Sequence, residues 1–152
     1  MRLAERGELM THHKDKTVLS MLRVEKLLED DFKKVKADGN LGELVKAISK
    51  SKRNIFPVLN EEKELVGVIS LDDIRDILFN TELYEKVEIS ELMQIPPAVI
   101  DHREKMEKVL EIFEETGAWN LPVTENGLYR GFISRSQIFS SYRKLLKEFS
   151  DD

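Results

Sequence analysis

The chain contains the same sequence pattern twice, and this internal duplication constrains its fold more than any other feature. Residues 55–79 hold two β-branched apolar segments, a charged connection, and then apolar residues at helical spacing. Residues 120–143 repeat this order. Identical residues recur 64 or 65 positions apart at Pro57 and Pro122, Val58 and Val123, Gly67 and Gly131, Ile69 and Ile133, Ser70 and Ser134, and Ile74 and Ile138. Two matched units predict two similar subdomains, because a solenoid normally needs three or more repeats.

The connection between the apolar segments differs between the copies, and this difference explains the change in offset. The first copy has the longer connection Asn60 to Glu64, whereas the second has Glu125 to Gly127. Asn126 and Gly127 tolerate the positive φ angles of a tight hairpin turn. The offset of 65 continues upstream, where Val24 matches Ile89, Leu27 matches Leu92, Val35 matches Ile100, Leu44 matches Val109 and Ile48 matches Phe113. The duplication therefore covers whole structural units.

Each unit predicts the order helix, strand, helix, two hairpin strands and helix. Asn40 and Glu43 form a capping-box pattern at the start of the second helix of the first unit, and Gly117 ends its counterpart. The expected elements are helices at 24–28 and 89–93, strands at 33–35 and 98–100, helices from Asn40 and over 104–116, the hairpin strands, and helices after Ser70 and Ser134. The predicted fold class is α+β, with two pseudo-symmetric repeats, each a small three-stranded sheet with helices, packed on each other.

The predicted domain boundaries follow the repeats. They are a linker at 1–23, repeat 1 at 24–79, a connector at 80–88, repeat 2 at 89–146 and a tail at 147–152. We expect the end of the linker to pack against repeat 1. His12, His13 and Asp15 are interpreted as solvated linker residues and not as metal ligands, because no further ligands lie at suitable spacing.

Composition excludes several functional classes. The 152 residues are 41% hydrophobic and 35% charged, and no apolar run approaches the roughly 20 residues that span a bilayer. We expect the chain as written to be soluble, since its N-terminus lacks the apolar region of a secretory signal. It has no cysteine, which removes disulfides and thiolate chemistry. Its net charge is −5 with the basic residues interspersed among acids, so no nucleic-acid partner is expected. No nucleophile has a nearby base, and catalysis is not expected.

The motifs resemble a known family. Phe56-Pro57-Val58 and Leu121-Pro122-Val123, with the segments from Gly67 to Asp73 and from Gly131 to Gln137, resemble a tandem pair of cystathionine-β-synthase (CBS) domains, a Bateman module. The resemblance implies adenine-nucleotide binding (ATP, ADP or AMP) in a cleft between the repeats, with no metal. The residues implied at nucleotide sites are Ser70, Asp73, Phe56, Pro57, Ser134 and Arg135.

A narrower resemblance concerns the parent protein. Residues 2–8, 11–19 and 117–123 are similar to the cytosolic tail of prokaryotic CLC-type chloride channels and transporters. That resemblance implies a cytoplasmic regulatory domain of an inner-membrane protein, whose partners would be a membrane-embedded chloride-transport domain and a second copy of itself. The alternative is an assembly module that binds no small molecule.

The site residues also have purely structural interpretations. Ser70 with Asp73, and Ser134 with Gln137, fit helix capping equally well. Since a carboxylate accepts from both ribose hydroxyls and Gln137 is a weaker acceptor, we expect one competent site at Ser70 and Asp73. Arg135 is a phosphate contact, an interface residue or a solvent-exposed residue. Lys52 and Arg53 are further phosphate candidates, although the C-terminal end of the preceding helix also explains their charge.

A homodimer is the last expectation. The final helices of the two repeats offer more apolar surface than one small domain readily covers. The residues that form this stripe are Ile74, Ile77, Leu78, Ile138 and Phe139.

Overall fold

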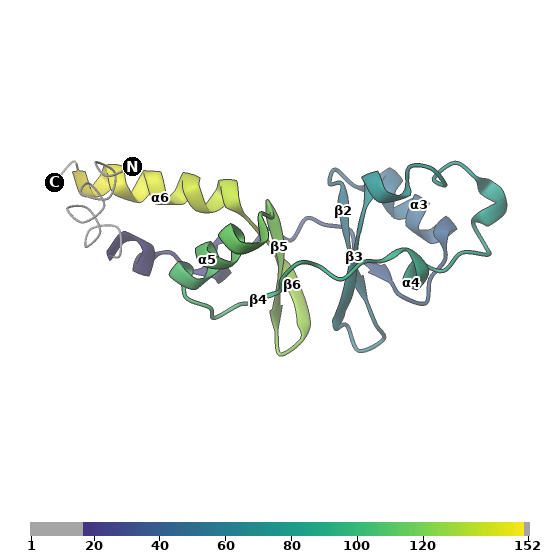
Figure 1. Ribbon diagram of the computed structural model, residues 1–152, viewed down its shortest axis with the longest axis horizontal. Helices are drawn as coiled ribbons and strands as arrows, with labels where there is room; N and C mark the ends of the chain where they lie inside the picture. Colours follow the sequence, from purple (N-terminus) through teal and green to yellow (C-terminus); the bar gives the residue numbers. More distant parts are fainter. Residues whose placement is uncertain (1–16, 151–152) are drawn as a thin grey trace.

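The computed structural model describes residues 17–150 and confirms the α+β class with two repeats. Two three-stranded sheets lie side by side in the middle of an elongated molecule, and helices lie at both outer ends (Figure 1). The predicted linker residues His12, His13 and Asp15 fall outside the described part. Within residues 17–150, no helix combines the length and apolar character needed to cross a membrane.

The order of elements is the same in both repeats. The first contains α2 (Val24–Leu27), β1 (Val35–Lys36), α3 (Leu41–Lys50), β2 (Ile55–Leu59), β3 (Leu65–Ser70) and the 3-10 helix η1 (Leu71–Ile74). A second 3-10 helix, η2 (Thr81–Leu83), lies between the repeats. The second repeat contains α4 (Ile89–Leu92), β4 (Ile100–Asp101), α5 (Met106–Thr116), β5 (Asn120–Glu125), β6 (Leu128–Ser134) and α6 (Arg135–Ser150).

Strand pairing repeats as closely as the sequence does. In the first sheet β1 runs parallel to β2, with Val35 beside Val58, and β3 runs antiparallel to β2. In the second sheet β4 is parallel to β5, and β6 is antiparallel to it. Pro57 lies in the central strand, where proline is normally excluded. It is tolerated because the short β1 pairs only with the next two residues, so no hydrogen bond to β1 is lost.

Local signals in the sequence correctly predicted several ends of elements. The Asn40 side chain accepts a hydrogen bond from the Glu43 amide at 2.9 Å, which caps α3. Gly117 ends α5 in the left-handed conformation, with φ of 69°. Asn126 and Gly127 have φ of 53° and 85°, as a tight hairpin turn requires. These predictions succeeded because each depends on neighbours in the chain.

The prediction of a full helix after Ser70 was wrong. Only the single turn η1 forms there, followed by further turns to residue 79, whereas the equivalent α6 has 16 residues. The segment carries Asp72, Asp73 and Asp76, and aspartate favours caps and turns over the interior of a helix. Its apolar residues are still used, since Ile74 is 2% exposed in the core of the first repeat.

Each repeat completes its core with the opening helix of the other repeat. Val24 and Leu27 of α2 pack in the core of the second repeat, together with Phe113 of α5. Ile89 of α4 packs in the core of the first repeat, together with Phe56. Figure 1 accordingly shows the purple N-terminal segment beside α5. The expectation that the end of the linker packs against the first repeat was therefore wrong.

Backbone hydrogen bonds fix this exchange in both directions. The amide of Glu29 donates to the carbonyl of Phe132 at 2.8 Å, and the amide of Phe132 donates back at 2.9 Å. In the same way, Val68 donates to the carbonyl of Gln94 at 2.9 Å and Gln94 donates to Val68 at 2.8 Å. The segment that follows each opening helix thus pairs with the last strand of the other repeat. We call these two segments, which contain Glu29 and Gln94, the exchanged segments. The two repeats form one folding unit.

The duplicated glycine is explained by this close approach. A Cβ atom on Gly131 would lie 2.8 Å from the carbonyl oxygen of Glu29, and its φ is 150°. A Cβ atom on the equivalent Gly67 would lie 2.8 Å from Sδ of Met93 and 3.1 Å from the carbonyl oxygen of Gln94. Only glycine lets the exchanged segments reach these strands without displacement.

We therefore expect Gly131→Ala to lower the free energy of unfolding by about 3 kcal/mol, because it adds a steric clash with Glu29 to the cost of its φ angle. Gly117→Ala is the matched control, since its Cβ would have no neighbour within 4 Å. That control should cost about 1 kcal/mol, the cost of a positive φ alone. Urea unfolding followed by circular dichroism measures both values. Equal losses would show that the close approach to Glu29 is unimportant.

Candidate ligand-binding junctions

Two equivalent junctions lie where the last strand of each repeat meets the following helix. At the Ser70 junction, defined by Asn54 and residues 70–73, the Leu71 amide donates to the carbonyl of Asn54 at 2.8 Å. At the Ser134 junction, defined by Trp119 and residues 134–137, the Arg135 amide donates to the carbonyl of Trp119 at 2.9 Å. The exchanged segments pair next to them, Gln94 beside the first and Glu29 beside the second. Each junction therefore combines elements of both repeats.

At the Ser70 junction the polar side chains are free. Ser70 does not cap η1, so the predicted capping role was wrong for this residue. Within residues 17–150, neither the Ser70 hydroxyl nor the Asp73 carboxylate has a hydrogen-bond or ion-pair partner. Asp73 is exposed and Ser70 is half-buried. The Leu71 amide at the start of η1 is already bound to the Asn54 carbonyl. A hydroxyl and a carboxylate are thus available together.

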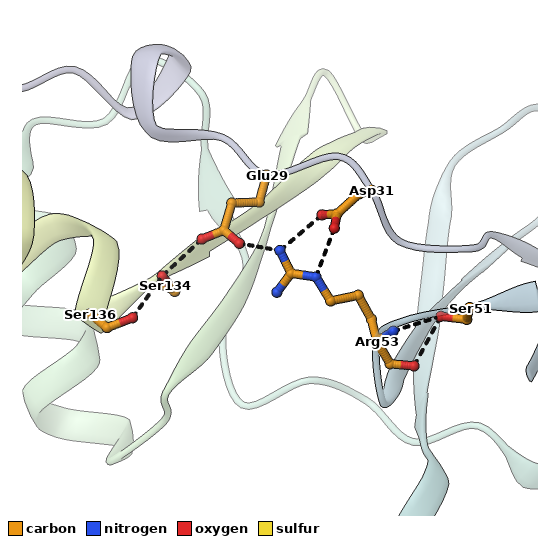
Figure 2. Close-up of polar contacts among 6 residues, drawn as sticks. All are labelled: Glu29, Asp31, Ser51, Arg53, Ser134 and Ser136. Atoms are coloured by element: carbon orange, nitrogen blue, oxygen red, sulfur yellow. Dashed lines mark hydrogen bonds and ion pairs between the residues drawn. The ribbon is translucent and has the colours of Figure 1, made fainter.

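At the Ser134 junction the equivalent hydroxyl is already used. Ser134 is 8% exposed, and its Oγ accepts from the Gln137 amide at 3.1 Å, which confirms the capping interpretation for this residue. The same hydroxyl donates to Oε1 of Glu29 at 3.0 Å (Figure 2). The carboxylate that reaches the start of α6 therefore comes from the exchanged segment.

Phe56 and Pro57 are both buried in β2. Phe56 is 0% exposed and packs in the core of the first repeat. The whole of β2 from Phe56 to Leu59 is buried. Any contribution of Phe56 to a ligand therefore falls to the backbone of the strand, as the family resemblance implies for the residues around adenine.

Arg135 contacts the end of α5. Its Nη2 donates to the carbonyl of Phe113 at 2.8 Å, and its guanidinium carbon lies 5.1 Å from the centroid of the Trp119 ring. A cation is favourable at this negative end of a helix, and the ring adds a cation–π contact. Arg135 is therefore not a solvent-exposed residue without contacts, which was one of the alternatives from the sequence. Trp119 remains 70% exposed.

Arg53 forms an ion cluster that the sequence did not reveal. Its Nε and Nη2 donate to the two carboxylate oxygens of Asp31 at 3.0 and 2.9 Å, and Nη2 also donates to Glu29 (Figure 2). Ser51 holds the backbone of Arg53, accepting from its amide and donating to its carbonyl, each at 2.9 Å. The guanidinium also lies 4.5 Å from the centroid of the Phe32 ring.

The charges of this cluster stabilise one another. The hydrogen bond from Arg53 is the main cause that holds the pKa of Asp31 below its usual value. Asp31 and Glu29 in turn raise the pKa of the Arg53 guanidinium above its usual range. The sequence did suggest a cation at the end of α3, but its partners lie 22 and 24 residues away, on the exchanged segment. No local pattern connects residues at that separation.

Three cavities of the structure are lined by neither Ser70 nor Ser134. A cavity of about 510 Å³ is lined by Arg23, His102 and Lys105, and one of about 450 Å³ by Lys36 and Glu43. A third, of about 750 Å³, lies where the two hairpins meet, at residues 60–63 and 128–130. Within the described part of the chain, no three histidine or acidic residues are placed to hold a metal ion.

Comparison with known proteins identifies the family. Residues 24–80 and 89–144 each match the family model of the CBS domain. The chain belongs to the CBS domain family, and the predicted tandem pair is confirmed. CBS domains are regulatory, not catalytic. None of the curated protein sequences gives a significant match.

Solved structures share the fold of the pair. A CBS domain protein from Streptococcus pneumoniae TIGR4 has a TM-score of 0.74 at 23% identity, covering 91% of this chain and 98% of that one. CbpB in complex with c-di-AMP has a TM-score of 0.73 at 20% identity, covering 91% and 96%. CBSX2 in complex with AMP has a TM-score of 0.66 at 21% identity, covering 81% and 97%. At these identities the likeness shows the fold.

The two serines differ in a way that mutagenesis can measure. Ser134→Ala should lower the free energy of unfolding by about 1–2 kcal/mol, because it removes the cap of α6 and a partner of Glu29. Ser70→Ala should stay within about 0.5 kcal/mol of the original protein, since Ser70 caps nothing. Thermal or urea unfolding of both variants is the measurement. Equal losses would contradict the difference between the junctions.

Proposed function

We propose that this chain is a regulatory module that binds an adenine nucleotide at the Ser70 junction. The observation that carries the proposal is the pair of free polar groups, the Ser70 hydroxyl and the Asp73 carboxylate, at the start of η1. A carboxylate accepts hydrogen bonds from both hydroxyls of a ribose, and exposed amides favour a phosphate. Support comes from two proteins of the same fold, whose structures contain AMP and c-di-AMP.

The Ser70 junction is favoured over the Ser134 junction for two reasons. The residue equivalent to Asp73 is Gln137, which offers a neutral and weaker acceptor. The Ser134 hydroxyl already donates to Glu29, so a ligand there would have to displace an internal carboxylate. The difference between the two junctions therefore supports a single competent nucleotide site at Ser70.

We also propose that the module acts as the cytoplasmic domain of a chloride channel or transporter in the inner membrane. The resemblance of residues 2–8, 11–19 and 117–123 supports this context. A CBS domain of a membrane protein from Sphaerobacter thermophilus has the same fold, with a TM-score of 0.71 at 16% identity, covering 88% of this chain and 96% of that one. Because Leu22 packs in the second repeat, nucleotide-driven movement between the repeats would move the N-terminal segment.

The alternative function is assembly without a ligand, and both functions include a homodimer. Ile74 and Ile138 are buried in the cores of their own repeats, so they offer no surface to a second copy. Large apolar side chains are exposed elsewhere: Phe79 is 85%, Ile95 is 88% and Phe139 is 46% exposed. These exposed side chains support self-association. Of the three, only Phe139 belongs to the predicted helical stripe, so the proposed contact surface differs from that stripe.

Nucleotide binding is tested by calorimetric titration with AMP, ADP and ATP. We expect saturable binding that Asp73→Asn weakens by about tenfold or more, since a hydrogen bond to a charged group contributes about 1.5–3 kcal/mol. Asp72→Asn is the control, because it removes the same charge from an exposed side chain that pairs only with Arg75, 2.8 Å away. Equal affinities in both variants would remove Asp73 from the site, and no binding at millimolar nucleotide would favour the assembly function.

Self-association is tested by light scattering at micromolar concentration, where we expect the mass of a dimer. Phe79→Ser should shift the mass toward that of the monomer if this exposed ring is at the interface. Val99→Ser, on another partly exposed apolar residue, is the control. A monomeric mass for the original protein would contradict the homodimer.

A further inference from the structure

The Glu29–Arg53 ion cluster lies directly at the start of α6. One carboxylate oxygen of Glu29 accepts from the Ser134 hydroxyl, and the other accepts from Nη2 of Arg53 (Figure 2). A single anionic group thus joins the first turn of a 16-residue helix to a guanidinium from the other repeat. A carboxylate is favoured at this position by the positive end of the helix dipole. The Glu29 carboxylate thus lies at an anion-favouring position beside the start of α6.

The same donors suit a phosphate. A guanidinium forms paired hydrogen bonds with phosphate as readily as with carboxylate, and phosphate carries more charge. The cluster is also accessible, because the side chains of Arg53, Glu29 and Asp31 are 32%, 23% and 60% exposed. Ion pairs at such exposed positions contribute little net stability, so an external anion can compete with them.

The other junction has no such cluster. Positions equivalent to Glu29, Asp31 and Arg53, at an offset of 65, hold Gln94, Pro96 and Ala118. The backbone of Gln94 pairs with Val68 in the same way as that of Glu29 pairs with Phe132. The exchange of segments therefore does not require the charges. Since one repeat achieves the same pairing with neutral residues, the backbone pairing itself does not depend on the ion cluster.

We propose that Glu29 is an internal competitor that keeps the Ser134 junction closed, and that a phosphate group opens it by taking Arg53 and the Ser134 hydroxyl from Glu29. The proposal rests on the proposed function in one respect, since the phosphate is that of the nucleotide the module senses. It adds a second, conditional site to the ready one at Ser70. The ligand class is a phosphorylated compound; a nucleoside without phosphate leaves the contact between Glu29 and Arg53 in place.

The contact of Glu29 with Ser134 also links the Ser134 junction to the N-terminal segment. Glu29 follows α2 in the chain, and α2 packs in the core of the second repeat. When phosphate releases the Glu29 side chain, the segment keeps its two backbone bonds to Phe132 but loses its side-chain contact with α6. Glu29, whose side-chain contact with Ser134 changes, lies only three residues after Lys26 of α2. The change therefore occurs within the exchanged segment itself.

The test uses the full chain and inorganic phosphate, followed by amide NMR shifts. Glu29→Gln keeps an acceptor for Ser134 but removes the charge, and it should tighten phosphate binding at residues 134–137 by about tenfold. Asp30→Asn is the matched control, because it removes one charge from the neighbouring exposed residue. It should change the affinity by less than about twofold. Adding Arg53→Gln to Glu29→Gln should abolish the response at Ser134, while circular dichroism verifies that each variant is folded.

The outcomes separate this inference from the nucleotide proposal. Equal phosphate affinities for Glu29→Gln and Asp30→Asn, or an unchanged response after Arg53→Gln, would overturn the role of Glu29 as a competitor. Shifts at residues 70–73 on addition of AMP to the original protein report the Ser70 site and do not depend on Glu29. If AMP produces no shifts there while phosphate binds tightly to Glu29→Gln, the nucleotide proposal fails and the internal competitor stands.

Discussion

The reciprocal pairing of two exchanged segments with the last strands of the repeats is the interaction on which the rest of the structure depends. Glu29 bonds to Phe132 and Gln94 bonds to Val68, each through two backbone hydrogen bonds. These four bonds place each opening helix over the sheet of the other repeat, where its apolar residues are needed. They also require glycine at positions 67 and 131, because a side chain there would meet the incoming segment.

Exchange also determines which residues meet at the two candidate junctions. Each junction combines a serine and a helix start from one repeat with a segment that belongs to the other. Any group on that segment therefore acts on the partner site and not on its own. The duplication gives both junctions the same strand pairing, but they differ in the helix that follows, η1 at one and α6 at the other. They also differ in single residues, Asp73 against Gln137 and Glu29 against Gln94, and therefore in charge.

The features that the sequence predicted are those that depend on neighbouring residues or on the duplication itself. The cap at Asn40, the end at Gly117 and the turn at Gly127 are local, and the order of elements along the chain followed from the repeat. The duplication placed Val24 in an opening helix but did not show which core buries it. In the candidate site, Ser70 and Ser134 were found from the motif. The partners of Arg53 were not, because charge pairs across 22 and 24 residues leave no periodic signal.

The exchange of opening helices has a consequence for the order in which the chain can fold during synthesis. Residues 18–28 emerge early but pack against strands that are made about a hundred residues later. The core of the first repeat, in turn, lacks Ile89 until the second repeat has begun. Neither core is complete while only one repeat has left the ribosome, and contacts of such long sequence separation form slowly. The nascent protein therefore exposes apolar surface until β6 has been made, and this interval is when it is open to chaperones and to aggregation.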